Sequence, residues 1–286
     1  MNSIIFLIDC PDRKGLVSSI STFFYELGFN IIHCQQYTDV QRNQYFMRLK
    51  LDMRTLQMSR KELEEKFSAF GATYKLNWSV HYSDYVQKVA LLVTKAPHCL
   101  YDLLVRQQEG ELQCEVPLII GNHPTLEHIA DKFRVPFYCL PVTPETRPQQ
   151  EETMRKLLKQ NHIDLVVLAR YMQVLSKELV AEYAGRVINI HHAFLPAFQG
   201  ASPYQQAYER GVKMIGATAH YANAELDEGP IIEQDVERVN HEQTIEELSR
   251  MGSDIERIVL ARAVKAHLEH RIIVSGKRTI VFSTGV

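Results

Sequence analysis

The second half of the chain contains the stretch VINIHHAFLP at residues 187–196, a short apolar run that ends in polar side chains. In an extended strand, side chains alternate between faces, so Asn189 and His191 lie on one face while Ile188 and Ile190 lie on the other. Ligands of open α/β sheets bind beyond the carboxyl ends of the strands, which is where this pair falls. The stretch therefore predicts a strand that delivers a carboxamide and an imidazole to a site.

Other apolar runs of similar length surround this strand and alternate with longer, polar-faced stretches. The apolar runs are Val89–Val93, Val116–Ile120, Phe137–Leu140 and Leu165–Leu168, and Glu152–Gln160 is a typical polar-faced stretch. This alternation is typical of βαβ units on a mainly parallel sheet. A long helix follows, with Thr244 and Glu247 as a capping box and an apolar stripe made of Ile245, Leu248, Ile255, Ile258 and Leu268. The second half is therefore predicted to be a Rossmann-like α/β domain.

The first 84 residues show a different pattern, in which four strands and two helices are predicted. The strands are expected at 3–8, 31–37, 44–52 and 74–82. One helix has apolar residues at helical spacing from Leu16 to Leu27 and ends at Gly28, and Ser59 caps the other. The order βαββαβ is ferredoxin-like. The polar segment 82–88 then separates two predicted domains, residues 1–84 and 85–286.

Composition excludes several classes of protein. The 286 residues carry a formal net charge of −2, which leaves no basic surplus for nucleic acid as the main partner. The five cysteines are odd in number and form no C-x-x-C pair, as expected of thiols kept reduced. The N-terminus lacks the basic region and cleavage site of a signal peptide, and no apolar run is long enough to span a membrane. We expect a cytoplasmic protein.

The polar residues at and near the predicted strands are the candidates for chemistry. The Asn189 amide can stabilise an oxyanion and His191 can move protons, although both would also serve as hydrogen-bonded structural residues. Asp227 precedes a Gly-Pro turn, so it is either a positioned carboxylate or a turn former, and His220 has a similar structural alternative on its strand. Because strand neighbours face opposite ways, His191 and His192 are not expected to share a metal ion.

Several of these stretches together resemble a known superfamily. They are N-I-H-H at 189–192, L-P-A-F at 195–198, residues 204–213 and 215–221, and the D-x-G element that begins residues 227–234. They resemble the 10-formyltetrahydrofolate hydrolase-transferase superfamily, and the match is closest to the formyltetrahydrofolate deformylases. It extends from about residue 88 to the C-terminus. The first 84 residues resemble an ACT domain, with DRKGLV at 12–17 as its turn-to-helix signature.

The resemblance implies a site and a reaction. Asn189, His191 and Asp227 fall on the catalytic trio of the family, and His220 falls on a supporting histidine. The segment that lines the folate pocket corresponds to Tyr171, Met172, Gln173, Val174 and Leu175. The implied reaction is hydrolysis of 10-formyltetrahydrofolate to tetrahydrofolate and formate, in one-carbon metabolism and purine biosynthesis. No metal and no cofactor beyond the folate substrate is implied.

The sequence also departs from the pattern of the superfamily. Gln173 stands where an Arg is common, Ala193 where a Ser is common and Tyr101 where a Gly is common, which bears on pocket shape and affinity more than on reaction type. Residues 94–99 replace the Gly-rich, phosphate-binding turn of glycinamide ribonucleotide formyltransferases with a turn that contains Ala96-Pro97. Water is therefore favoured as the formyl acceptor. The alternatives are formyl transfer to an amine and a catalytically silent folate or amino-acid sensor.

The ACT-like part implies regulation and assembly. Asp12, Gly15 and Leu16 belong to the signature that would bind a small amino acid, and the resemblance suggests glycine or methionine. Binding at an interface between two ACT domains would also make the protein a homo-oligomer. The alternative is that this part only mediates assembly.

Overall fold

The structure, a computed structural model, describes residues 2–55, 57–196, 203–225 and 227–284. It divides into two compact units. The first unit comprises residues 1–86, 269–275 and 280–286, and the second comprises residues 87–268 and 276–279. The division after Val86 falls close to the predicted boundary. Most of the C-terminal segment belongs to the first unit, which corrects the expectation that residues 85–286 form one domain.

The first unit has the predicted βαββαβ order. Its elements are β1 (Ser3–Pro11), α1 (Leu16–Glu26), β2 (Ile31–Asp39), β3 (Gln44–Asp52), the 3₁₀ turn Met53–Thr55, α2 (Arg60–Tyr74) and β4 (Asn77–Tyr82). The strands form an antiparallel sheet in the order β2-β3-β1-β4. The last strand begins later than predicted, because α2 continues to Tyr74 and ends at Lys75, whose φ is 54°.

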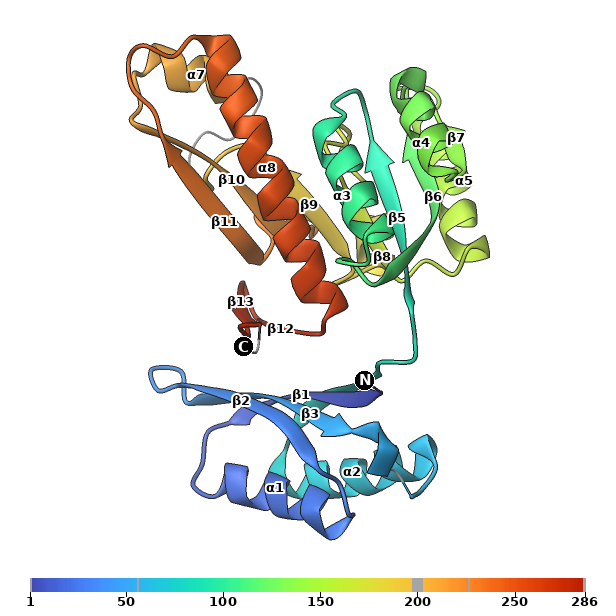
Figure 1. Cartoon of the computed structure of the whole chain (residues 1–286), viewed down its shortest axis with the longest axis vertical. Coiled ribbons are helices and arrows are strands. Elements are labelled where there is room, and N and C mark those ends of the chain that lie inside the picture. The colour runs from blue at the N-terminus through green and yellow to red at the C-terminus, as the bar shows by residue number, and fades with distance from the viewer. Residues whose placement is uncertain (1, 56, 197–202, 226, 285–286) are drawn as a thin grey trace. The chain divides into compact units, whose positions relative to one another are not determined.

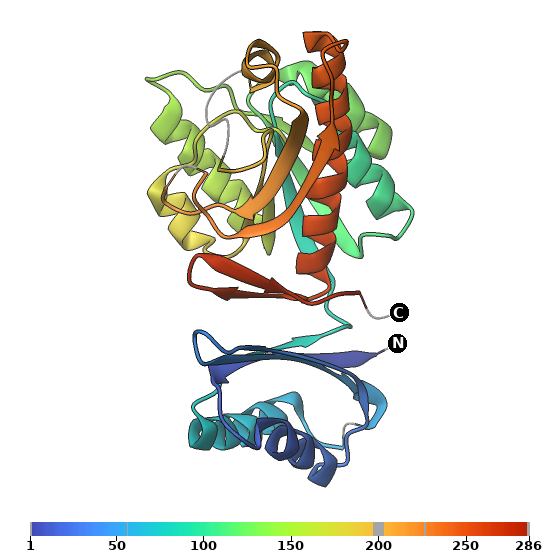
Figure 2. The same ribbon diagram turned by 90° about the vertical axis from the view of Figure 1, so that its left-hand side faces the viewer.

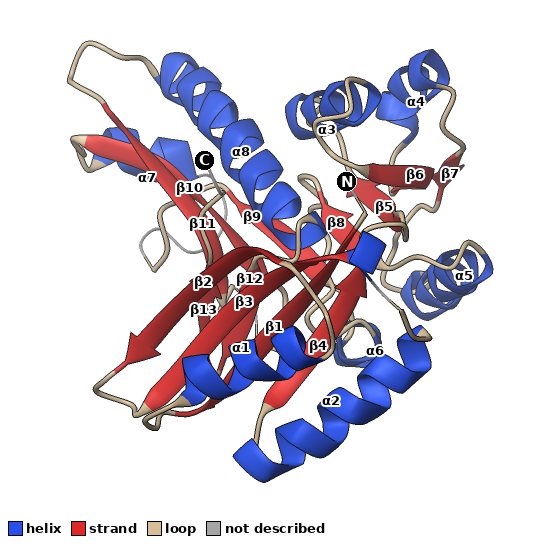
Figure 3. Ribbon diagram, turned by 60° about the horizontal axis from the view of Figure 1, so that its bottom comes forward, coloured by secondary structure: helices blue, strands red, loops and turns tan. Residues whose placement is uncertain are grey.

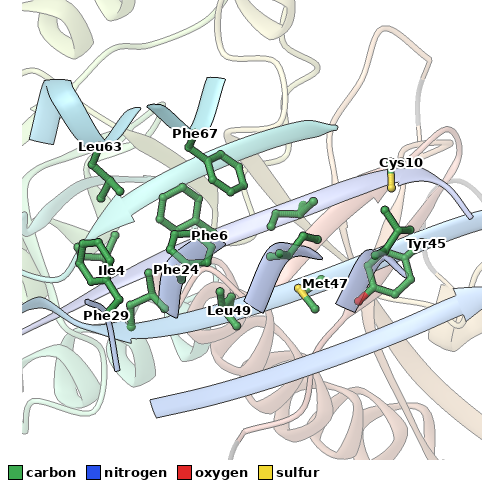
Figure 4. Packing of buried hydrophobic residues seen from close by; sticks show 14 residues of the cluster. Ile4, Phe6, Cys10, Phe24, Phe29, Tyr45, Met47, Leu49, Leu63 and Phe67 are labelled. Carbon is green, nitrogen blue, oxygen red and sulfur yellow. The ribbon is translucent and has the colours of Figure 1, made fainter. Parts of the chain in front are cut away.

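Helices α1 and α2 cover one face of this sheet (Figure 3). Behind them lies an aromatic core in which the ring centroid of Phe6 is 4.9 Å from that of Phe24 and 4.6 Å from that of Phe67 (Figure 4). All three side chains are fully buried. Because truncating a buried aromatic ring costs about 3–5 kcal/mol, this cluster fixes how the two helices pack on the sheet.

The other face of the sheet is covered by the C-terminal segment. The hairpin of β12 (Ile272–Ser275) and β13 (Arg278–Val281) belongs to this segment, and Ile273 and Phe282 pack against Ile5, Leu7 and Phe46. Strand β1 is therefore buried on both faces, which explains its nearly continuous apolar sequence. The predicted second domain included this segment because its sequence alone does not show which sheet it covers.

The first unit also contains a histidine whose protonation should control its stability. The ring of His81 stacks on His270 with centroids 3.7 Å apart, and burial lowers the pKa of His81 to about 4. A folded-state pKa below the unfolded value of about 6.5 means that the neutral form stabilises the fold. This contribution, at most about 3 kcal/mol, is complete above pH 6.5 and is lost as pH falls through 4.

We therefore expect His81→Gln to flatten the pH dependence of unfolding between pH 6.5 and 4. Urea unfolding followed by fluorescence checks this, because Trp78 is the single tryptophan of the chain and packs in the core of the first unit. The matched control is His33→Gln on β2 of the same sheet. An unchanged pH profile in His81→Gln would contradict the assignment.

The second unit is an α/β domain, as predicted. Its elements are β5 (Gln87–Val93), α3 (His98–Gln108), β6 (Cys114–Gly121), the 3₁₀ turn Pro124–Leu126, α4 (Glu127–Phe133), β7 (Phe137–Cys139), α5 (Arg147–Gln160), β8 (Leu165–Leu168), α6 (Lys177–Glu182), β9 (Val187–His191), α7 (Pro203–Glu209), β10 (Met214–Tyr221), β11 (Ile231–Arg238) and α8 (Ile245–Leu268). The sheet order is β11-β10-β9-β8-β5-β6-β7. Strands β5 to β9 pair in parallel, and β10 and β11 are antiparallel.

Helix α8 packs on β9, β10 and β11 and against α3 (Figures 1 and 2). The predicted capping box begins it, because the Thr244 amide donates to Glu247 Oε2 at 2.8 Å and the Glu247 amide donates to Thr244 Oγ1 at 3.2 Å. Its buried face is wider than the predicted stripe and includes Val259 and Leu260. Among the described residues, no helix is long and apolar enough to cross a membrane.

Candidate active site

The carboxyl ends of β8 and β9 open into a cavity of about 270 Å³. Its walls are residues 170–175 after β8, residues 189–192 at the end of β9, His220 on β10, and residues 222–225 with Asp227 in the loop before β11. The cavity thus brings together every catalytic and folate-pocket residue that the sequence singled out. The crevice beyond the carboxyl ends of parallel strands is where this fold class binds ligands.

Asp227 connects the two histidines of the cavity wall. Its Oδ2 lies 3.2 Å from His191 Nδ1, and its Oδ1 lies 3.7 Å from His220 Nε2. The side chain is 12% exposed, and its φ of 56° is a left-handed conformation that Asp tolerates better than most residues. The hydrogen bond with His191 and the nearby ring of His220 outweigh burial and hold the pKa of Asp227 far below its ordinary value. The residue is therefore a permanent carboxylate as well as a turn former.

His220 fixes the orientation of Asn189. Its Nδ1 lies 3.0 Å from the Tyr221 carbonyl oxygen, which can only accept, so Nδ1 carries the proton. In the neutral ring, Nε2 is then an acceptor, and Asn189 Nδ2 donates to it at 3.2 Å. One amide hydrogen of Asn189 is used in this way and the other is left for a ligand. The side chains of Asn189 and His191, two residues apart on β9, both reach the His220–Asp227 pair, as expected of residues that share one face of a strand.

The adjacent histidines His191 and His192 do not lie on opposite faces as the sequence predicts. The sequence placed them on opposite faces of a strand, but β9 ends at His191, and both residues line the cavity with ring centroids 5.3 Å apart. His191 Nε2 is buried and has no hydrogen-bond partner among the described residues. Burial, reinforced by the charge of Arg170, lowers the pKa of His192 to about 4, so His192 is neutral at physiological pH.

The segment after β8 forms one wall of the cavity as an irregular loop. Tyr171 is buried and its hydroxyl accepts from Gln150 Nε2 at 3.2 Å, whereas Met172 and Val174 are 54% and 56% exposed. The amide of Met172 donates to Thr94 Oγ1 at 2.9 Å. The loop therefore presents apolar side chains and backbone groups, together with Gln173 and Leu175, to the cavity.

The departures from the superfamily pattern lie in different places. Gln173 lines the cavity, whereas Ala193 is buried beside it and its carbonyl accepts from Thr218 Oγ1 at 2.9 Å. Tyr101 lies on α3, where its ring packs edge-on against Phe133 with centroids 5.4 Å apart. Ala197 and Phe198 of the L-P-A-F motif lie outside the described residues.

Gly229 is required by close packing behind the site. A Cβ at this position would lie 1.6 Å from the Tyr221 carbonyl oxygen and 3.2 Å from His220 Nδ1. Gly229→Ala must therefore displace the carbonyl that fixes the ring of His220. We expect it to lower kcat by about tenfold to a hundredfold, the range for a small misplacement of catalytic groups.

The measurement for Gly229→Ala is a steady-state assay of turnover, with Gly185→Ala as the control. Gly185 also lies in the second unit and has a positive φ of 69°, but a Cβ at this position would meet no atom within 4 Å. Equal activities of the two variants would show that the contact behind His220 is unimportant.

One group of described residues has the composition of a metal site. Potential ligand atoms of His98, Cys99 and Glu256 lie within 4.8 Å of one another. However, Glu256 is already paired with the guanidinium of Arg170, at 3.3 Å from Nε to Oε2, and accepts from the Tyr204 hydroxyl at 2.7 Å. Burial raises the pKa of Cys99 well above its ordinary value, which disfavours the thiolate that zinc needs. These residues fit a hydrogen-bonded cluster better than an ion, and the absence of a metal stays a prediction.

Sequence reasoning missed two charged residues at the site. Arg170 lines the cavity, and Glu256 is a 1% exposed carboxylate on α8. Arg170 immediately precedes the predicted pocket segment 171–175, and Glu256 lies next to Ile255 of the predicted apolar stripe. The sequence signal that could have found Glu256 was its place beside the apolar stripe of the helix, because a charged residue there is buried only when it is paired.

Fold and site together define a formyl transferase domain that follows an ACT domain. The formyl transferase family model matches residues 87–264, and the ACT domain model matches residues 4–65. A glycinamide ribonucleotide transformylase structure from Symbiobacterium toebii shares this fold, with a TM-score of 0.66 at 28% identity, covering 71% of this chain and 97% of that one.

Similarity over nearly the whole chain narrows the class to one family. A formyltetrahydrofolate deformylase of Synechocystis sp. is 51% identical over 277 residues, which is 97% of each chain. That of Bacillus subtilis is 44% identical over 278 residues, covering 97% of this chain and 93% of its own. The crystal structure of a deformylase from Pseudomonas syringae has a TM-score of 0.96 at 41% identity, covering 99% and 95% of the two chains. The chain belongs to the formyltetrahydrofolate deformylase family.

Proposed function

We propose that this enzyme hydrolyses 10-formyltetrahydrofolate to tetrahydrofolate and formate, with Asn189, His191 and Asp227 as its catalytic residues. The observation that carries the proposal is the carboxylate of Asp227 bound to His191 on the wall of a cavity that Asn189 also lines. The apolar loop 171–175 on another wall suits the flat pterin of the substrate.

The reaction begins when water attacks the formyl carbon and gives one proton to Nε2 of His191, which becomes the imidazolium and later passes that proton to N10. The formyl oxygen becomes an oxyanion, which the second amide hydrogen of Asn189 and the protonated imidazole of His191 stabilise. The bond from carbon to N10 then breaks, N10 takes up a proton, and the carbon leaves as formate. Water therefore supplies one oxygen of formate and the proton on N10, and the remaining proton is released to solvent.

The two acid–base groups have different roles in this mechanism. A carboxylate whose pKa is held far below its ordinary value is a weak proton acceptor near neutral pH. Asp227 therefore orients His191 and the attacking water and balances the charge of the imidazolium. The unpartnered Nε2 of His191 is the nitrogen that exchanges protons with the reacting atoms. We propose no metal and no cofactor besides the folate substrate.

The turn at residues 94–99 supports water as the acceptor. Pro97 caps α3 and has no amide hydrogen, Thr94 Oγ1 is bound to the Met172 amide, and His98 Nε2 lies 2.8 Å from Glu256 Oε2. Pro97 therefore offers a substrate phosphate no amide donor, and His98 is held by Glu256, so this turn suits a phosphate less well than a Gly-rich turn does. Formate release should therefore not depend on an added amine. Product formation that requires an amine would favour formyl transfer, and folate binding without turnover would favour a sensor.

For the first unit we propose a regulatory site for a small amino acid, glycine or methionine, in a homo-oligomer. Gly15 precedes α1 with a φ of 93°, the Asp12 amide donates to the Asn43 carbonyl at 2.9 Å, and Leu16 is buried. A left-handed glycine next to a helix N-terminus leaves backbone donors open to a carboxylate.

Asp12→Ala and Gly15→Ala should each raise the amino-acid concentration needed for half-maximal response by at least about tenfold, as expected when a charged hydrogen bond is lost. The assay measures kcat against added glycine or methionine, with light scattering to follow oligomeric state. The matched control is Gly28→Ala at the other end of α1, where φ is 79°. If both variants respond like Gly28→Ala, the proposed site is wrong.

A further inference from the structure

Arg170 breaks several local rules at once. Its φ is 63°, a left-handed conformation that costs a non-glycine residue about 1 kcal/mol or more. Its Nη1 is buried without a hydrogen-bond partner among the described residues, and its Nε has only the ion pair with Glu256 at 3.3 Å, so part of the guanidinium is desolvated without hydrogen bonds. Strained and desolvated residues persist only where the surrounding structure holds them in place. They are found most often at functional sites.

Glu256 holds Arg170 in this position. Its buried Oε2 lies 3.3 Å from Arg170 Nε and 2.8 Å from His98 Nε2, and its Oε1 accepts from the Tyr204 hydroxyl at 2.7 Å. Burial opposes ionisation of Glu256, but His98, Arg170 and Tyr204 outweigh it and keep the pKa of Glu256 below its ordinary value. The carboxylate is therefore a fixed anchor on the long helix α8.

Close packing also helps to hold the Glu256 carboxylate in place. Gly252 lies one turn before Glu256 on α8, and a Cβ at this position would lie 2.0 Å from the Tyr204 hydroxyl oxygen. The missing side chain leaves room for the phenol to reach the carboxylate. Arg170 is thus oriented from behind by a packed cluster rather than by solvent.

Arg170 makes its part of the cavity wall positive. It is the single Lys or Arg among the described residues that line the cavity, and its side chain is 18% exposed. At His192, the effect of the Arg170 charge on the pKa is larger than the opposing effect of Glu256. At His192, which lies in the same cavity wall, the positive charge of Arg170 thus prevails over the charge of Glu256.

We propose that Arg170, oriented by Glu256, binds the carboxylate of formate as hydrolysis forms it in the cavity. The inference rests on the proposed function, because formate arises when the bond from the formyl carbon to N10 breaks. Its two oxygens, one from the formyl group and one from water, match the fork of a guanidinium, which binds carboxylates more specifically than an ammonium does. Glu256 is a positioning residue in this scheme.

Product inhibition by sodium formate tests the proposal, with sodium chloride at equal ionic strength as the reference. We expect Arg170→Gln to raise the inhibition constant of formate by about tenfold to a hundredfold, the range for loss of a charged hydrogen bond. Arg170→Lys should show a smaller rise. Glu256→Gln should also raise the inhibition constant of formate, because Arg170 remains but loses the charged carboxylate that orients it.

Two further variants keep the test decisive. Arg170→Gly fits the left-handed backbone and should lose formate binding even if Arg170→Gln folds poorly. Arg134→Gln is the matched control, because Arg134 also has a left-handed φ, of 57°, but is exposed and does not line the cavity. An inhibition constant in Arg170→Gly within about twofold of wild type would overturn the proposal.

The same experiment separates failure of this inference from failure of the proposed function. Wild-type protein that releases no formate from 10-formyltetrahydrofolate would refute the proposed function. Formate binding to wild-type protein and to Arg170→Gly is then compared directly by calorimetry, without substrate. Wild-type protein that releases formate, but responds to sodium formate no more than to sodium chloride, would refute only the role of Arg170.

Discussion

Asp227→Asn is expected to lower kcat for formate release by at least about a hundredfold, the range for loss of a group that acts in proton transfer. Asparagine keeps the size of the side chain but removes the charge that pairs with His191 at 3.2 Å. The imidazolium that stabilises the oxyanion then loses its counter-charge in a partly buried site. Stopped assays at saturating substrate measure this directly.

The stability of this variant provides a second readout with a defined sign. The pKa of Asp227 is lower in the folded state than in the unfolded chain, so its ionised form stabilises the fold. That contribution is complete above the unfolded value of about 4 and is lost as pH falls through the folded-state pKa. Asp227→Asn should therefore be less stable than wild type at neutral pH, and the difference should shrink in acid.

The matched control is Asp235→Asn on β11, where the carboxylate forms an exposed ion pair with Arg262 at 3.0 Å. We expect kcat of this control within about twofold of wild type, because exposed pairs contribute little. Near-normal formate release by Asp227→Asn would remove the proposed mechanism.

His191→Ala is expected to have an effect of similar size, at least about a hundredfold on kcat. The substitution removes both the oxyanion donor and the nitrogen that exchanges protons. Because His191 and Asp227 act as a unit, the double variant His191→Ala/Asp227→Asn should be only slightly worse than the worse single variant. Fully multiplicative effects would mean that the two residues act independently.

His192→Ala is the control for this prediction. Its ring also lines the cavity, next to His191, but it is neutral at physiological pH and forms no ion pair with Asp227 among the described residues. We expect a loss below about tenfold, which is less than proton transfer contributes. A larger loss in His192→Ala than in His191→Ala would exchange the roles of the two histidines.

Local patterns predicted much of the fold and half of the site. The period of two in β9 brought Asn189 and His191 to one face, and the capping box at Thr244 located the start of α8. These features involve residues close together in sequence, so the regular geometry of a strand or a helix is enough to determine where their side chains lie. The approach of Asp227 to His191 was inferred from the superfamily resemblance, because no spacing rule relates a loop before β11 to the end of β9.

The features that sequence reasoning missed are all non-local. Arg170 and Glu256 lie on different elements, and their contact depends on how α8 packs against the sheet. Most of the C-terminal segment belongs to the first unit because Ile273 and Phe282 complete an apolar face that β1 leaves open. Such pairings depend on tertiary packing, which a pattern along one segment does not contain.

The most direct test of the account is formate release from 10-formyltetrahydrofolate by the wild-type enzyme, with no acceptor other than water. The account predicts equal amounts of formate and tetrahydrofolate, formed at a rate that neither an added amine nor a metal chelator changes. Product that forms only with an amine, or turnover that the chelator abolishes, would contradict it.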